Sequence, residues 1–106
     1  MVNKFYNIGK KLFPLNRSIT GKDTLKSLQI ISKNFKKFKI KKIQSGKKVF
    51  DWKIPAEWNV KEAYILDKNK DKIVDFKKNN LHLVGYSKKT KLILTKDELL
   101  KKLHSL

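Results

Sequence analysis

Cysteine is absent from the 106-residue sequence, and glycine (four residues) and proline (two residues) are scarce. Without cysteine the chain has no disulfides and no thiolate metal sites. Four glycines do not form a glycine-rich loop that could cradle a phosphate. No apolar run approaches the ~18 residues of a membrane-spanning helix, and charges interrupt the start of the chain where a signal peptide needs a continuous apolar centre. These absences predict a cytoplasmic chain with no membrane partner.

Acidic residues are also scarce, since 9 Asp and Glu oppose 27 Lys and Arg and the formal net charge is +18. Every basic residue except Arg17 is a lysine. Lysine acts as a point charge, whereas arginine forks onto phosphate and reads guanine edges. Two interpretations stay open: a lysine-dense solvated surface supplied by AT-rich codons, or selected binding to nucleic acid or an anionic membrane. The first predicts only weak, nonspecific nucleic-acid binding at low salt.

Apolar residues are plentiful enough for a folded chain. Leu, Ile, Val and Phe make up 34 of the 106 residues, well above the share of roughly 20% that flags disorder. The length allows one small domain at most. A chain of this size buries only about 60 to 70% of its unfolded surface, which leaves little room for a deep cleft. A self-sufficient enzyme is therefore not expected.

Helical periodicity marks both ends of the sequence. Residues 2–13 predict a short helix ended by Pro14, and apolar residues at helical spacing predict a second helix over 20–35. Thr95 and Glu98 stand at capping-box spacing and open a final helix that reaches the last residue. The apolar face of the first helix could anchor on a membrane, but such a face more often packs on its own domain.

Alternating apolar residues predict strands in the middle of the chain. Phe38 and Ile40 alternate with lysines, and Phe50, Trp52 and Ile54 alternate after a turn at 45–46. The runs 64–66 and 73–76 flank the polar segment 67–71 and predict a β-hairpin, and 81–86 predict a further strand. The predicted fold class is α+β, with two N-terminal helices, a mostly antiparallel β middle and a C-terminal helix.

The hairpin segment resembles the start of a calcium-binding loop. Asp67, Asn69 and Asp71 supply the opening oxygens of such a loop. Its sixth position should be glycine and is Lys72, and its twelfth should be glutamate and is Lys78. Two ammonium groups would repel the cation, so the segment is interpreted as a hairpin turn.

The remaining candidate chemistry is sparse. A catalytic zinc needs at least three protein ligands, and the only histidines are His82 and His104, 22 residues apart. Neither is predicted to be catalytic or to bind a metal. Trp52 and Trp58, with Phe50, could stack on nucleobases beside lysines, but aromatic residues that alternate along a strand are more often core.

A specific resemblance is carried by strings that occur in order along nearly the whole chain. They are LFPLNRSITG at 12–21, SG at 45–46, VFDW at 49–52, PAEWNV at 55–60, DF at 75–76 and NNLH at 79–82. Together they closely resemble the opening of the bacterial aminopeptidase-like proteins. These are related to zinc exopeptidases and are also described as polysaccharide-biosynthesis proteins with an aminopeptidase-like domain.

The resemblance implies a larger fold, in which an α/β zinc-peptidase domain carries an inserted, mainly β domain. Residues 1–35 would be leading helices of the peptidase-like domain, 36–94 part of the insert, and 95–106 a C-terminal helix. The family's metal ligands lie far downstream and match no position here. The resemblance therefore implies a non-catalytic N-terminal segment, truncated before the metal site and inactive alone, with zinc expected only in the full-length family. The expected partner is the remainder of the polypeptide, if separately encoded, and unpacked helices favour self-association.

The resemblance also marks individual residues whose role it does not define. They are Asn16, Arg17, Ser18, Gly21, Asp51, Trp52 and Trp58. Among them, the turn at 16–18 and the Asp51–Trp52 pair are predicted to be architectural rather than to contact substrate. A small lysine-rich nucleic-acid-binding module is the alternative function.

Overall fold

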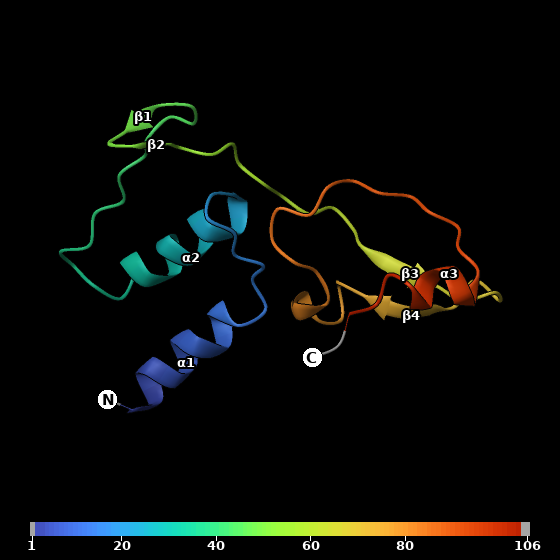
Figure 1. Ribbon diagram of the computed structural model, residues 1–106. Helices are drawn as coiled ribbons and strands as arrows, with labels where there is room; N and C mark the ends of the chain where they lie inside the picture. Colours follow the sequence, from blue (N-terminus) through green and yellow to red (C-terminus); the bar gives the residue numbers. More distant parts are fainter. Residues whose placement is uncertain (1, 105–106) are drawn as a thin grey trace.

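The computed structural model describes residues 2–104 and shows helices at both ends and two small antiparallel sheets between them (Figure 1). The elements, in chain order, are α1 (Val2–Leu12), α2 (Lys22–Ser32), β1 (Lys48–Val49), β2 (Trp52–Lys53), β3 (Tyr64–Leu66), β4 (Lys72–Asp75), the 3-10 helix η1 (Asn80–His82) and α3 (Lys96–Leu100). The predicted α+β class is confirmed. The boundaries at 35 and 94 stay a prediction.

Helices α1 and α2 lie against each other as an N-terminal pair. Helix α1 ends two residues before Pro14, because proline disfavours helical backbone in the residue that precedes it. Helix α2 begins after Gly21, and Asp23 in its first turn complements the positive end of the helix dipole. It ends at Ser32, three residues before the predicted end.

The β segment consists of two separate hairpins. Strand β1 pairs with β2, with Val49 opposite Trp52. Strand β3 pairs with β4 as predicted, with Tyr64 opposite Asp75. Asp67 closes the second hairpin, because its Oδ1 accepts the backbone N–H groups of Asn69 and Asp71 at 2.8 and 2.9 Å. The oxygens that resembled a calcium loop therefore belong to a turn, as interpreted from the sequence.

Three predicted strand segments differ in the structure. Phe38 and Ile40 lie in irregular chain, because lysines surround them and no strand pairs with them among residues 2–104. Phe50 lies in the two-residue turn between β1 and β2, so the alternation from Phe50 to Ile54 does not follow one strand. The predicted strand 81–86 begins as η1, because the Asn79 side chain accepts the N–H of Leu81 and starts a helical turn.

The C-terminal helix is shorter than predicted. Thr95 and Glu98 form the predicted capping box, in which the Thr95 N–H donates to the Glu98 carboxylate at 2.7 Å. Helix α3 nevertheless ends at Leu100, and residues 105 and 106 of the predicted helix lie outside the described part of the chain.

The described chain is open and has no apolar core of its own. Between residues 2 and 104 no apolar residue is buried, and the buried residues are Ser27 and Asp75. The radius of gyration is 18.2 Å, against about 13 Å for a compact domain of this length. Trp52 is 48% exposed, so the prediction of a core role for this residue is wrong.

Candidate functional site

Hydrogen bonds join three loop segments that are far apart in the sequence, residues 13–21, 56–60 and 79–87, which we define as the loop junction. Ser18 is at its centre, because its hydroxyl lies 2.6 Å from the Thr20 carbonyl and 3.2 Å from the Trp58 carbonyl. The Trp58 N–H donates to the Thr20 carbonyl at 3.1 Å. Thr24, on α2, donates its hydroxyl to the Ser18 carbonyl at 2.7 Å. The Ser18 loop is thus bound both to α2 and to the Trp58 segment.

Gly21 allows the Trp58 segment to approach the start of α2. A Cβ atom at this position would lie 2.6 Å from the Trp58 carbonyl oxygen, closer than any side chain tolerates. The backbone of Gly21 is extended, so the missing side chain matters for space. Next to it, the Lys22 N–H donates to the Asn59 side chain at 2.8 Å. Asn59 therefore satisfies one of the unpaired donors at the helix N-terminus.

Trp58 joins the third segment of the loop junction. Its indole ring stacks on Tyr86 with 5.8 Å between ring centroids and 23° between ring planes. Its Nε1–H donates to the Ser87 carbonyl at 3.0 Å. The Tyr86 hydroxyl in turn accepts the Thr20 N–H at 3.3 Å. Because both the face and the edge of the indole are engaged within the chain, Trp58 acts here as a packing residue.

Asn80 fixes the other end of the LFPLNRSITG loop. Its side-chain amide donates to the carbonyls of Phe13 and Leu15 at 3.0 and 3.3 Å. The Asn16 N–H donates to the Asp23 carboxylate at 3.1 Å. Two shallow pockets, with volumes of about 200 and 330 Å³, lie next to the Asn16–Asp23 hydrogen bond, and Asp23 lines both of them. Neither pocket is enclosed by apolar side chains in the way that small-molecule sites usually are.

The seven residues marked by the resemblance divide into two groups. Five belong to the loop junction: Asn16, Arg17, Ser18, Gly21 and Trp58. Arg17 is exposed, and no hydrogen bond of its guanidinium is recorded between residues 2 and 104. Asp51 and Trp52 lie at the tip of the β1–β2 hairpin, away from the loop junction (Figure 1).

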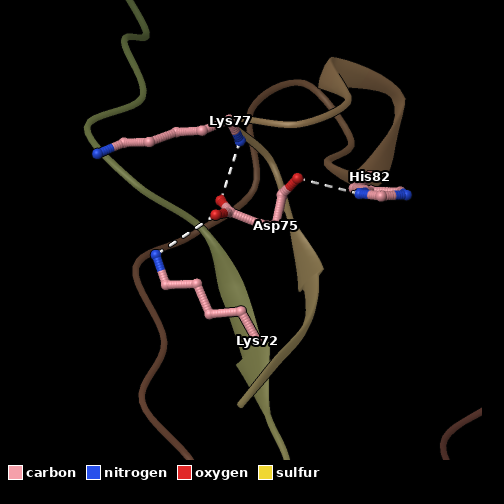
Figure 2. Close-up of polar contacts among 4 residues, drawn as sticks. All are labelled: Lys72, Asp75, Lys77 and His82. Carbon is pink, nitrogen blue, oxygen red and sulfur yellow. Dashed lines mark hydrogen bonds and ion pairs between the residues drawn. The ribbon is translucent and has the colours of Figure 1, made fainter.

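Asp75, the buried carboxylate, lies in the DF string of the resemblance but is not among its seven marked residues. Its Oδ1 accepts the Lys77 N–H at 3.0 Å and its Oδ2 accepts the Lys72 ammonium at 3.4 Å (Figure 2). The Lys77 N–H, aided by the Lys72 charge and opposed by burial, holds the pKa of Asp75 below its usual range. The signal that could have identified it is a lone acid at the end of a strand, followed two residues later by a turn.

His82 lies next to the backbone carbonyl of Asp75. Its Nδ1 is 3.2 Å from the Asp75 carbonyl oxygen, and since a carbonyl only accepts, Nδ1 carries the proton (Figure 2). Residues 2–104 contain no group of three His, Cys, Asp or Glu side chains placed to hold a metal ion. The described residues therefore do not fit the zinc site that the resemblance implies for the larger family. In the same range, no helix is long and apolar enough to cross a bilayer.

Comparison with known proteins agrees with this α+β architecture. Residues 57–106 match the family described as "Domain of unknown function (DUF2172)". Over 103 residues the chain is 44% identical to a Clostridium acetobutylicum protein named "Putative polysaccharide biosynthesis protein with aminopeptidase-like domain", covering 97% of this chain and 24% of that one. The crystal structure of a "putative peptidase" from Clostridium acetobutylicum superposes with a TM-score of 0.87 at 43% identity, over 98% of this chain and 24% of that one.

The segment is an open α+β unit that spans about a quarter of the length of the relatives it matches. The chain is similar to the N-terminal portion of a protein named as having an aminopeptidase-like domain. The resemblance stated from the sequence strings is thereby confirmed.

Proposed function

We propose that residues 1–106 are a non-catalytic segment of an aminopeptidase-like protein, and that their function is to pack against the polypeptide that makes up the other three quarters of the relatives. One observation carries this proposal. No apolar residue is buried between residues 2 and 104, although a solved relative four times as long contains the same fold. Apolar surface of this extent in a soluble fold normally marks an interface.

The polar side chains support the same assignment, because they already hold the segment together. Asp23 receives the Asn16 N–H, Asp67 closes a turn and Glu98 caps α3. Asp75 is bound to Lys72 and Lys77. Carboxylates engaged in this way stabilise loops and caps. In an aminopeptidase, by contrast, carboxylates and imidazoles must converge on the metal and its water.

The zinc implied by the resemblance is assigned, under this proposal, to the part of the relatives beyond the matched quarter. A role in polysaccharide biosynthesis is printed in the name of the Clostridium acetobutylicum relative and is proposed here for the assembled protein alone. The predicted cytoplasmic location stays a prediction.

The test compares the 106-residue chain with a chimera. In the chimera, residues 1–106 replace the matching quarter of the Clostridium acetobutylicum protein. Bound zinc is measured by elemental mass spectrometry, and turnover with an aminoacyl p-nitroanilide. We expect the chain alone to bind no stoichiometric zinc, to show no turnover and to self-associate in sedimentation experiments. We expect the chimera to be a defined species with bound zinc.

Two outcomes would overturn the proposal. The first is stoichiometric zinc and turnover by the 106-residue chain alone, both lost in His82→Ala. The second is a chimera in which residues 1–106 stay as accessible to protease as in the isolated chain while the rest of the protein folds.

A further inference from the structure

The tip of the β1–β2 hairpin projects from the rest of the molecule (Figure 1). Its two-residue turn consists of Phe50 and Asp51, because Val49 lies opposite Trp52. Phe50 is 92% exposed and Trp52 is 48% exposed. The hairpin thus presents two large aromatic side chains to solvent.

The backbone conformation at the first position of this turn is unfavourable for phenylalanine, which occupies it. Phe50 has φ 54°, while Asp51 is not among the residues with positive φ. A two-residue hairpin turn with positive φ only at its first position is the type II′ pattern, which normally has glycine there. A bulky side chain in this region is strained, and such strain persists where function requires the residue. An aromatic ring therefore occupies a position that glycine would fill more favourably.

We propose that Phe50 and Trp52 are an anchor that inserts into an apolar pocket rimmed by carboxylates, on the polypeptide that corresponds to the other three quarters of the relatives. This inference rests on the proposed function and names the contact through which the segment packs. Exposed aromatic residues at a hairpin tip have the composition of interface hot spots.

The length of the solved relative favours this occupant. The same fold occupies 24% of a solved chain, so most of that relative lies outside the matched segment and can cover the hairpin. The charge of the hairpin defines the chemistry of the pocket rim. Exposed lysines flank the tip at Lys47, Lys48 and Lys53, and only Asp51 opposes them. A pocket edged with Asp or Glu complements this pattern.

A second copy of the chain fits less well. Two hairpins packed tip to tip would bring six of these lysines together, and like charges at an interface are unfavourable. The formal charge of +18 adds to the repulsion between copies. Self-association through this hairpin is therefore an alternative outcome of the test.

The first experiment measures accessibility at position 50. The chain has no cysteine, so Phe50→Cys introduces a single thiol whose maleimide labelling is followed by peptide mass spectrometry. In the isolated chain we expect rapid labelling, and in the chimera we expect labelling slower by at least about 100-fold, as for a fully covered side chain. Lys68→Cys, in the exposed β3–β4 turn, is the control and should label rapidly in both proteins.

The second experiment separates anchoring from backbone strain. Lys70 also has positive φ, at 69°, in the other hairpin turn. Lys70→Gly and Phe50→Gly relieve the same kind of strain, but Phe50→Gly also removes the anchor ring. In the chimera, Lys70→Gly should keep or raise the melting temperature, whereas Phe50→Gly should lower it by about 4 °C or more.

Each outcome decides between the proposals. If the chimera protects residues 1–106 from protease but position 50 labels as fast as in the isolated chain, the anchor is wrong and the proposed function stands. A higher melting temperature for Phe50→Gly would also overturn the anchor. If residues 1–106 stay unprotected throughout, both proposals fail. If slow labelling appears in the isolated chain at high concentration, a second copy is the occupant. Should the chimera not fold, the same thiol is placed at the aligned position of the Clostridium acetobutylicum protein.

Discussion

Gly21 lies where the start of α2 and the Trp58 segment touch. Because an added Cβ would be 2.6 Å from the Trp58 carbonyl, Gly21→Ala must push the two segments apart. We expect the free energy of unfolding of the chimera to fall by about 1 to 3 kcal/mol, as for other overpacked sites. The measurement is urea denaturation followed by tryptophan fluorescence.

Gly9 provides a matched control for this substitution. It lies within α1, and an added Cβ would have no atom within 4 Å. Gly9→Ala should therefore stabilise the chimera by about 0.5 to 1 kcal/mol through helix propensity alone. A destabilisation equal to that of Gly21→Ala would contradict the close-approach argument.

Asp75 makes the fold sensitive to acid. Its pKa is lowered in the folded chain, mainly by the Lys77 N–H. The stabilisation is therefore complete above the unfolded pKa of about 3.9 and is lost as the pH falls through the lower folded value. Carboxyl chemical shifts in an NMR titration should show Asp75 titrating below the usual range of an aspartate. A midpoint of Asp75 in the usual range would contradict the hydrogen-bonding scheme.

His82 contacts the backbone carbonyl of Asp75. Because the Asp75 carbonyl requires a proton on Nδ1, the neutral ring must have a bare Nε2. Nitrogen chemical shifts of the imidazole at neutral pH should therefore show the Nδ1–H form. The Nε2–H form would show that the contact is absent in solution.

At the scale of elements, sequence signals that span only a few residues predicted the helix ends and turns that short-range hydrogen bonds form. The Pro14 stop, the Asp67 turn and the Thr95 capping box each involve residues within a few positions of one another, and each was predicted. The strand predicted over 81–86 failed because Asn79, a cap two residues upstream of Leu81, competes with the apolar alternation.

The loop junction could not be predicted in this way. The hydroxyl of Ser18 reaches the Trp58 carbonyl across 40 residues, and the Asn80 amide reaches Phe13 across 67. Such contacts carry no local periodicity. The family resemblance marked Ser18 and Trp58 as residues of interest but said nothing about their proximity to each other.

Residues 88–94 form no regular secondary structure. Among residues 2–104 the structure records no backbone–backbone hydrogen bond for them, although Leu92, Ile93 and Leu94 form an apolar run and Ile93 is 95% exposed. We expect their amides to exchange with deuterium at nearly the unprotected rate in the isolated chain. The Phe76 N–H, which donates to the Ala63 carbonyl at 2.9 Å, should exchange more slowly. Equal rates at both places would contradict the described bonding.

At the scale of the whole molecule, charge and shape act together. A net charge of +18 is distributed over a surface of 10224 Å², and the structure records one ion pair between residues 2 and 104, Lys72 with Asp75. Nearly all of the lysines are therefore free to attract anions. These lysines are spread over an open chain and can contact the phosphates of a nucleic acid as point charges. The described residues do not place them on a helix or strand shaped to enter a DNA groove.

Duplex DNA should consequently bind to the 106-residue chain weakly and without regard to sequence. Binding driven by counterion release falls steeply with salt, so about six phosphate contacts imply a loss of roughly 10³-fold in affinity between 50 and 200 mM salt. Fluorescence anisotropy with two duplexes of unrelated sequence measures both properties. Equal affinities and a steep salt slope are expected, because lysine charges carry no base readout. A preference for one duplex that survives at about 200 mM salt would instead support a nucleic-acid-binding module, and the lysines would then have been selected for that partner.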